Sequence, residues 1–355
     1  MSGYIDLRTS IKLEKKLVHI EALRAIAVVL VIWHHYFNYA QSKITGTYLR
    51  SISDFFISFG ACGVQIFFAL SGFIILTREL GKKQDESFAR FMLLRYTRLW
   101  PGIIFLAITS LPLLGVQNWI KALGPSLTLL DPAIFNKISG SLSFIWMSDV
   151  MWSLFSEIRF YAIFSIIFFI FRRFSVQKRV LFLVLFLGLG KALTLLSLGS
   201  DAFRSIEFIS LSRDSSYFVL GMLLGLNYEF SRDSLGAKIR CALVPAVTGL
   251  FLEYFTYLPA AREFFILIPV ISLMILIPLD NFLIRFLARY IGSASYLSYL
   301  LHMNVLLLFY KYSGTQQLVG EILLIPLLVL LIAFLVARYL EPTAIKALRS
   351  LLRVS

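Results

Sequence analysis

Two residue types that bind and activate substrates lie within one apolar stretch, "EALRAIAVVLVIWHHYF", residues 21–37. Arg24 and His35 are eleven positions apart, and at about 100° per residue this spacing places both on nearly the same face of a helix. His34 is ten positions from Arg24 and points roughly 80° aside. An imidazole titrates near neutral pH, so His35 is the candidate general base for a hydroxyl group.

The same stretch also allows a structural interpretation. In that case Arg24 extends to the cytoplasmic surface, paired with Glu21 three residues before it, and His35 lies in the outer interface. Along the helix axis Arg24 and His35 are about 16 Å apart. Charged and titratable groups in hydrocarbon cost free energy and are functional candidates by default.

A second polar face is expected in "SDVMWSLFSEIRFYAIF", residues 148–164. Asp149, Ser153, Glu157 and Tyr161 recur every four residues, so they share one side of a helix. Glu157 is expected at a depth comparable with His35, where a carboxylate orients an imidazole. Tyr161 is a secondary candidate, and the alternative for Glu157 is a structural pair with Arg24.

The segment "RYTRLWP" contains a pair of arginines. Arg95 and Arg98 are three residues apart and share a helix face. Two guanidinium groups on one face bind a phosphate or pyrophosphate with bidentate geometry. The alternative is ordinary anchoring of a membrane protein by cytoplasmic positive charge.

Two further apolar stretches carry small or polar residues. "FGACGVQIFFALSGFII" contains Gly63, Ser71 and Gly72, which favour close helix packing and also suit a narrow slot for a ligand. "GSASYLSYLLHMNVLLLF" places His302 near mid-membrane, three residues after Tyr299. A single buried histidine is more often a hydrogen-bonding partner than a catalyst, so His302 is a secondary candidate, as is His34.

The bulk composition indicates a polytopic membrane protein. Of the 355 residues, 59% are hydrophobic and 15% charged, whereas soluble proteins average about 45–50% and roughly 25%. The net charge of +14 is spread over short segments between apolar runs, a distribution that argues against nucleic-acid binding. The two cysteines, Cys62 and Cys241, have no metal-ligand spacing, so we expect neither a metal site nor a disulfide framework.

Apolar runs of about 20 residues cross a bilayer as helices. The segments on the side of the N-terminus hold more than twice as many Lys and Arg residues as those on the other side, which favours cytoplasmic termini. The sequence therefore predicts an all-α polytopic membrane protein of one domain, 1–355, with about ten transmembrane helices and an uncleaved first run. The ten runs are 20–38, 55–77, 99–116, 150–171, 180–199, 208–228, 240–257, 264–281, 291–310 and 318–339.

Taken together, these motifs resemble the acyltransferase type 3 family of integral membrane proteins. The family's Arg–His pair maps onto Arg24 and His35, its Arg-x-x-Arg onto Arg95 and Arg98, and its acidic residue onto Glu157. The order of the motifs extends over most of the chain. They are "LRAIAVVLVIWHHY", "GVQIFFALSGFII", "RYTRLWP", "WSLFSEIRFY", "YFVLGMLLG", "SYLSYLLH" and "ARYLEP".

The resemblance implies an enzyme of the bacterial inner membrane that takes an acyl group from cytoplasmic acyl-CoA. Acetyl-CoA is the commonest donor in the family, and the acceptor is a hydroxyl of an envelope polysaccharide or lipid-linked glycan. Many relatives carry an additional extracytoplasmic hydrolase-like domain. No such domain follows here, so we expect the stand-alone form associated with O-acetylation of lipopolysaccharide O-antigen or a similar glycan.

The expected mechanism distributes these residues between two depths. Arg95 and Arg98 hold the CoA phosphates, with help from Lys82 or Lys83, and the pantetheine arm passes near Gly63 and Ser71. His35, oriented by Glu157, deprotonates the acceptor hydroxyl or becomes transiently acylated. Arg24 stabilises the thioester oxygen or holds CoA. The rival function is a proton-coupled transporter or flippase of a lipid-linked sugar.

Overall fold

The computed structural model describes nearly three-quarters of the chain, and every regular element in that part is helical. The described residues are 7–41, 44, 46–80, 87–140, 143–171, 173–197, 212–230, 281–313 and 321–352. This agrees with the predicted all-α class. The predicted runs 240–257 and 264–281 lie outside the described residues, apart from residue 281.

The chain divides into two compact units whose segments alternate along the sequence. Unit 1 comprises Met1–Leu30, Ser58–Lys82 and Phe174–Ser293. Unit 2 comprises Val31–Ile57, Lys83–Arg173 and Ala294–Ser355. Helix α1 (Leu7–Ala40) is continuous and contributes its first part to unit 1 and its last ten residues to unit 2.

The core of unit 1 forms where α3 (Cys62–Leu80) packs against α9 (Ser212–Phe230). Gly72 faces the backbone of Phe218, and Gly221 faces the backbone of Ala69. At both sites an added Cβ would lie within about 2 Å of a carbonyl oxygen, so only glycine permits this approach. The predicted role of Gly72 in close helix packing is confirmed.

Substitution of Gly221 tests this packing. Gly221→Ala places a Cβ 1.8 Å from the Ala69 oxygen, so the two backbones must separate. We expect a loss of about 1–3 kcal/mol in folding stability and a lower Tm in thermal unfolding of the detergent-solubilised protein. Gly188→Ala on α7 (Val176–Ser197) is the matched control, because nothing lies within 4 Å of its added Cβ. Equal Tm values for the two variants would contradict this packing.

The first part of α1 packs against the helical segment that leads to α13. This segment comprises α12 (Phe282–Phe286), the π-helical turn η2 (Leu287–Ile291) and the 3₁₀ turn η3 (Gly292–Ala294). Ala22 of α1 is buried with Ile284 and Ala288. Gly292 lies so close to the Glu21 carbonyl that an added Cβ would be 2.0 Å from its oxygen. Small residues thus fix the part of α1 that carries Glu21 and Arg24.

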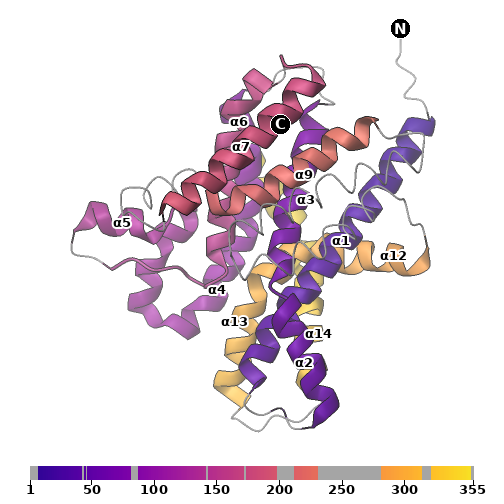
Figure 1. Cartoon of the computed structure of the whole chain (residues 1–355). Helices are drawn as coiled ribbons and strands as arrows, with labels where there is room; N and C mark the ends of the chain where they lie inside the picture. The colour runs from indigo at the N-terminus through magenta and orange to yellow at the C-terminus, as the bar shows by residue number, and fades with distance from the viewer. Residues whose placement is uncertain are drawn as a thin grey trace. The chain divides into compact units, whose positions relative to one another are not determined.

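Unit 2 is built around α4 (Phe88–Thr128), which packs against α6 (Met151–Phe171) and α13 (Ser295–Ser313). Figure 1 shows α14 (Glu321–Leu335) beside α13. The remaining elements are α2 (Thr47–Phe59), α5 (Pro132–Ser139), η4 (Val336–Leu340) and α15 (Glu341–Leu351).

Hydrogen bonds fix α13 against α4. The Tyr296 hydroxyl donates to the Leu99 carbonyl oxygen at 2.6 Å, and Asn304 Nδ2 donates to Thr109 Oγ1 at 3.0 Å. Gly102 provides the space for the Tyr296 ring, since a Cβ there would lie 2.6 Å from the ring edge. These contacts set the register of α13 and hence the position of His302 along α4.

Two predicted runs differ from the observed helices at a glycine. The run 55–77 is split between α2 and α3 by a turn at Gly60 and Ala61. The run 99–116 is part of the longer α4, which breaks at Gly115, where φ is +71°. That backbone conformation is readily open only to glycine. Apolar periodicity alone does not locate either break.

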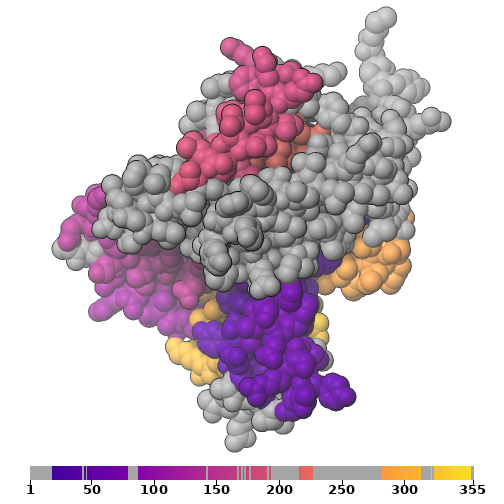
Figure 2. Space-filling view, viewed as in Figure 1, coloured from indigo at the N-terminus to yellow at the C-terminus, as the bar shows by residue number. Residues whose placement is uncertain are grey.

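Five described helical stretches are long and apolar enough to cross a membrane: Val18–Ala40, Thr47–Arg78, Phe88–Thr128, Phe282–Tyr312 and Leu324–Leu351. They coincide with five of the predicted runs. Three more runs fall on the helices α6, α7 and α9. Exposed apolar side chains on α2, including Tyr48, Ile52 and Phe55, suit a lipid-facing surface; this part of the chain forms the purple surface low in Figure 2. The total of ten and the orientation remain predictions.

Candidate functional site

His35 lies against a second histidine in unit 2. The ring centroids of His35, on α1, and His302, on α13, are 5.1 Å apart, with 40° between the ring planes. His302 is fully buried, with 1% of its surface exposed, whereas His35 is partly accessible. The structure therefore places the predicted general base beside a residue that sequence analysis ranked only as a secondary candidate.

The hydrogen bonds of His302 define its tautomer. Nδ1 lies 2.5 Å from the carbonyl oxygen of Tyr299, and because a carbonyl oxygen only accepts, Nδ1 carries the proton. Nε2 is then an acceptor, and within the described part of the chain this buried nitrogen has no hydrogen-bond partner. An unsatisfied buried acceptor costs free energy. The ring of His35 lies beside that of His302, with the two ring centroids 5.1 Å apart.

His34 differs from His302 in the hydrogen bonds of its ring nitrogens. Its Nδ1 donates to the carbonyl oxygens of Ile57, at 3.1 Å, and Phe56, at 3.3 Å, near the end of α2. Its Nε2 accepts a hydrogen bond from Asn38 Nδ2 at 3.1 Å. Both ring nitrogens are therefore satisfied, and His34 joins α1 to α2. These contacts suit a structural role for His34, and the catalytic role of His35 stays a prediction.

A hydrogen bond connects the histidine pair to the polar face of α6. The Tyr299 hydroxyl and Ser153 Oγ are 2.8 Å apart, and both residues are buried. Ser153 lies one helical turn before Glu157, which accepts a hydrogen bond from the Tyr161 hydroxyl. The orientation of His35 by Glu157 stays a prediction; the ring neighbour described for His35 on another helix is His302.

Tyr161 also contacts Arg95, one of the two arginines predicted to bind phosphate. The Arg95 guanidinium carbon lies 5.1 Å from the centre of the Tyr161 ring and 5.3 Å from that of Phe91. Tyr161 is within electrostatic reach of Arg98 as well. Arg95 is almost buried and Arg98 is exposed. Cation–π contacts orient the Arg95 plane, while Arg98 is open to a ligand.

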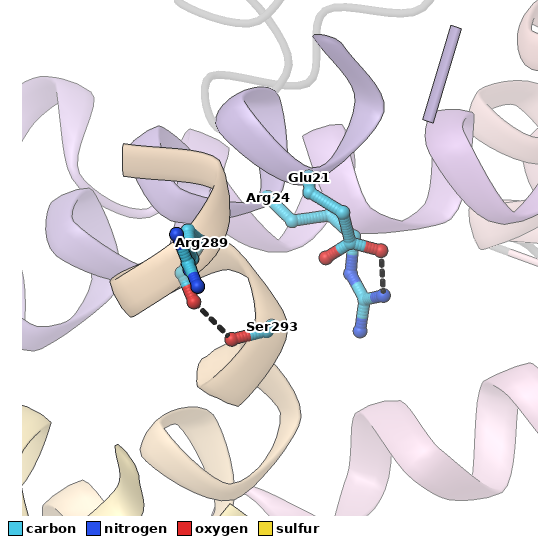
Figure 3. A network of polar contacts seen from close by, with 4 residues as sticks. All are labelled: Glu21, Arg24, Arg289 and Ser293. Atoms are coloured by element: carbon cyan, nitrogen blue, oxygen red, sulfur yellow. Dashed lines mark hydrogen bonds and ion pairs between the residues drawn. The ribbon is translucent and has the colours of Figure 1, made fainter. Parts of the chain in front are cut away.

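Arg24 belongs to unit 1, where it forms the expected ion pair. Arg24 Nη1 lies 3.1 Å from Glu21 Oε1, and both side chains are partly exposed. Figure 3 shows this pair on α1, with Arg289 and Ser293 on the neighbouring helical segment. Ser293 Oγ donates to the Arg289 carbonyl oxygen at 2.6 Å.

Ser71 lies on α3, also in unit 1, and is partly accessible. Within the residues whose contacts the structure describes, no three His, Cys, Asp or Glu side chains form a group able to hold a metal ion.

The residue whose importance the sequence did not indicate is His302. Its proximity to His35 joins positions far apart in the chain, and neither helical periodicity nor spacing signals such a contact.

A family model described as an acyltransferase domain matches residues 17–338, which is most of the chain. No curated protein and no solved structure matches significantly.

Proposed function

Because the chain belongs to the acyltransferase type 3 family, whose model matches residues 17–338, we propose that it transfers an acetyl group from acetyl-CoA to a hydroxyl of an envelope glycan. The family makes the protein an acyltransferase enzyme, and with the long apolar helices it makes the chain a multi-pass membrane protein. We propose the bacterial inner membrane as its location. Lipopolysaccharide O-antigen is the acceptor we favour.

The observation that carries the proposal is the contact between His35 and His302. We propose that His302 Nε2, which has no partner among the described residues, accepts a hydrogen bond from one ring nitrogen of His35 in the reacting complex and leaves the other nitrogen of His35 as the base. This is the orienting role that a carboxylate has in hydrolase triads. Here a neutral imidazole holds the base without placing a second charge in the membrane.

The proposed step keeps atoms and charge in balance. His35 removes the proton of the acceptor hydroxyl as the oxygen attacks the thioester carbonyl carbon. The carbon–sulfur bond then breaks, and CoA leaves as a thiol after taking the proton from His35. The products are the acetyl ester and free CoA.

The covalent alternative uses the same residue. If His35 itself attacks the thioester, labelled acetyl-enzyme accumulates when the acceptor is omitted. Direct transfer leaves no label on the protein under those conditions.

Arg95 and Arg98 are proposed to bind the phosphates of the donor. Arg98 is exposed, and the Arg95 guanidinium lies over the rings of Phe91 and Tyr161. Their shared helix face and the bidentate geometry of guanidinium groups support this role. The donor-binding roles that the family resemblance implies for Ser71 and Arg24 stay predictions.

The arginine assignment predicts a donor-specific defect. Arg98→Ala should raise the KM for acetyl-CoA about 10–100-fold, since hydrogen bonds to charged groups contribute roughly 1.5–3 kcal/mol. S-acetylpantetheine, which lacks the phosphates, should be used equally well by the wild type and the variant. Steady-state kinetics with both donors measure this. An equal defect with both donors would contradict phosphate binding by Arg98.

The function itself is tested with labelled donor. Membrane vesicles that contain the protein are incubated with [¹⁴C]acetyl-CoA and O-antigen, and label is measured in the polysaccharide. Vesicles without the protein are the control. Label in the glycan that depends on the protein supports the proposal. Movement of unmodified lipid-linked sugar without any acetylation would favour the transporter instead.

A further inference from the structure

A second polar cluster of unit 2 begins directly after His35 on α1 and extends one helical turn beyond it. It comprises Tyr36 and Tyr39 of α1, Tyr310 of α13 and Glu321 of α14, which we call the tyrosine cluster. The rings of Tyr39 and Tyr310 are stacked, with centroids 5.8 Å apart and 18° between their planes. Tyr36 is within electrostatic reach of both Tyr310 and Glu321.

The cluster pairs an accessible aromatic surface with a buried acceptor. Tyr39 is 47% exposed, so one side of the stack is open. Glu321 Oε2 is buried, and in the described part of the chain it has no hydrogen-bond partner. A buried carboxylate oxygen without a donor costs free energy. Tyrosines that only anchor a protein in the membrane interface do not require such a carboxylate.

These features match the chemistry of a sugar ring. One face of a pyranose is a set of apolar C–H groups that stack on an aromatic ring, and its edge carries hydroxyl donors for a carboxylate. An aromatic platform with a few placed polar groups is the usual construction of a small-ligand site. Tyrosine supplies the contact area at a low entropy cost.

The tyrosine cluster also lies close to His35, the proposed base, along α1. Tyr39 follows His35 by four residues, which places it on nearly the same face of α1 and about 6 Å further along the axis. From the His35–His302 contact to the Tyr39–Tyr310 contact, residue numbers rise on both α1 and α13. A sugar stacked on Tyr39 would therefore present a hydroxyl toward His35.

We propose that the tyrosine cluster binds one sugar ring of the acceptor glycan, with Tyr39 as the stacking surface and Glu321 as the acceptor for a sugar hydroxyl. This inference rests on the proposed function, because it assumes a glycan acceptor. It names a recognition site for that acceptor separate from the histidine pair.

Direct binding tests the proposal without any acyl transfer. Saturation-transfer NMR on the purified protein in detergent would use three probes: methyl α-glucopyranoside, methyl α-galactopyranoside and methyl α-rhamnopyranoside. Tetramethylammonium is a fourth probe, for a cation site. We expect the wild type to bind at least one glycoside, and Tyr39→Ala and Glu321→Gln each to weaken that binding at least tenfold.

Matched variants separate recognition from membrane anchoring. Tyr312→Ala removes an exposed tyrosine of α13 outside the cluster, and it should leave glycoside binding within twofold of the wild type. Tyr39→Phe keeps the ring and should bind like the wild type. Binding of tetramethylammonium alone, binding of no glycoside, or equal losses in the Tyr39→Ala and Tyr312→Ala variants would each overturn the sugar site.

Kinetics distinguish this site from the proposed function. In Tyr39→Ala the KM for the glycan acceptor should rise at least tenfold, while the KM for acetyl-CoA stays within twofold. Glycoside binding without acetyl transfer would contradict the proposed function and leave the sugar site intact. Acetyl transfer with an unchanged acceptor KM would contradict the sugar site alone.

Discussion

Replacing His35 with alanine should lower the rate of acetyl transfer by about 10²–10⁴-fold, the usual contribution of a general base. His35 is the partly accessible member of the histidine pair. Alanine removes the proposed base but leaves Arg95 and Arg98, the residues proposed to bind the donor, in place. The KM for acetyl-CoA should therefore stay near the wild-type value, as measured by steady-state kinetics with purified protein.

The adjacent histidine provides the control. His34 is held by Ile57, Phe56 and Asn38 and joins α1 to α2. His34→Ala should lower the Tm and reduce kcat far less than His35→Ala does. The opposite result would be a folded but inactive His34→Ala protein together with an active His35→Ala protein. That result would contradict the account and identify His34 as the base.

Replacing His302 with leucine should lower kcat roughly 10–100-fold, by analogy with the loss of residues that orient catalytic or metal-bound histidines. Leucine fills the buried site but offers no acceptor to His35. The KM values for donor and acceptor should change little, because His302 orients the base and is not proposed to touch either substrate. Kinetics of the purified variant measure both constants.

His302→Gln separates orientation from packing. The glutamine Oε1 is an acceptor that can replace Nε2, so this variant should recover a substantial part of the activity lost in His302→Leu. The pH profile of kcat should shift in His302→Leu and remain closer to the wild type in His302→Gln. Equal losses in both variants with an unchanged pH profile would indicate that His302 only fills space.

Single-helix features were predictable from the sequence. The face shared by Glu157 and Tyr161 and the Glu21–Arg24 pair depend on helical spacing of three or four residues. The structure contains both contacts. The presence of the long helices was also predictable, because apolar runs of about 20 residues indicate membrane-spanning helices.

Contacts between helices were not predictable from one sequence. Ser153 and Tyr299 are 146 positions apart and share a hydrogen bond, and His35 and His302 are separated still further. Such pairs depend on which helices become neighbours and on their register. The register of α13 depends on Gly102 and on the Tyr296–Leu99 hydrogen bond, neither of which helical periodicity reveals.

We propose that the donor reaches His35 from the cytoplasmic face of the membrane and the acceptor from the other face, and proteoliposomes of known orientation test this most directly. Purified protein is reconstituted, labelled acetyl-CoA is supplied only on the face exposing Arg98, and the glycan acceptor only on the other. The account predicts labelled glycan, no labelled glycan when the two substrates are exchanged between the faces, and almost none with His35→Ala. Transfer only when both substrates share one face, or undiminished transfer by His35→Ala, would contradict it.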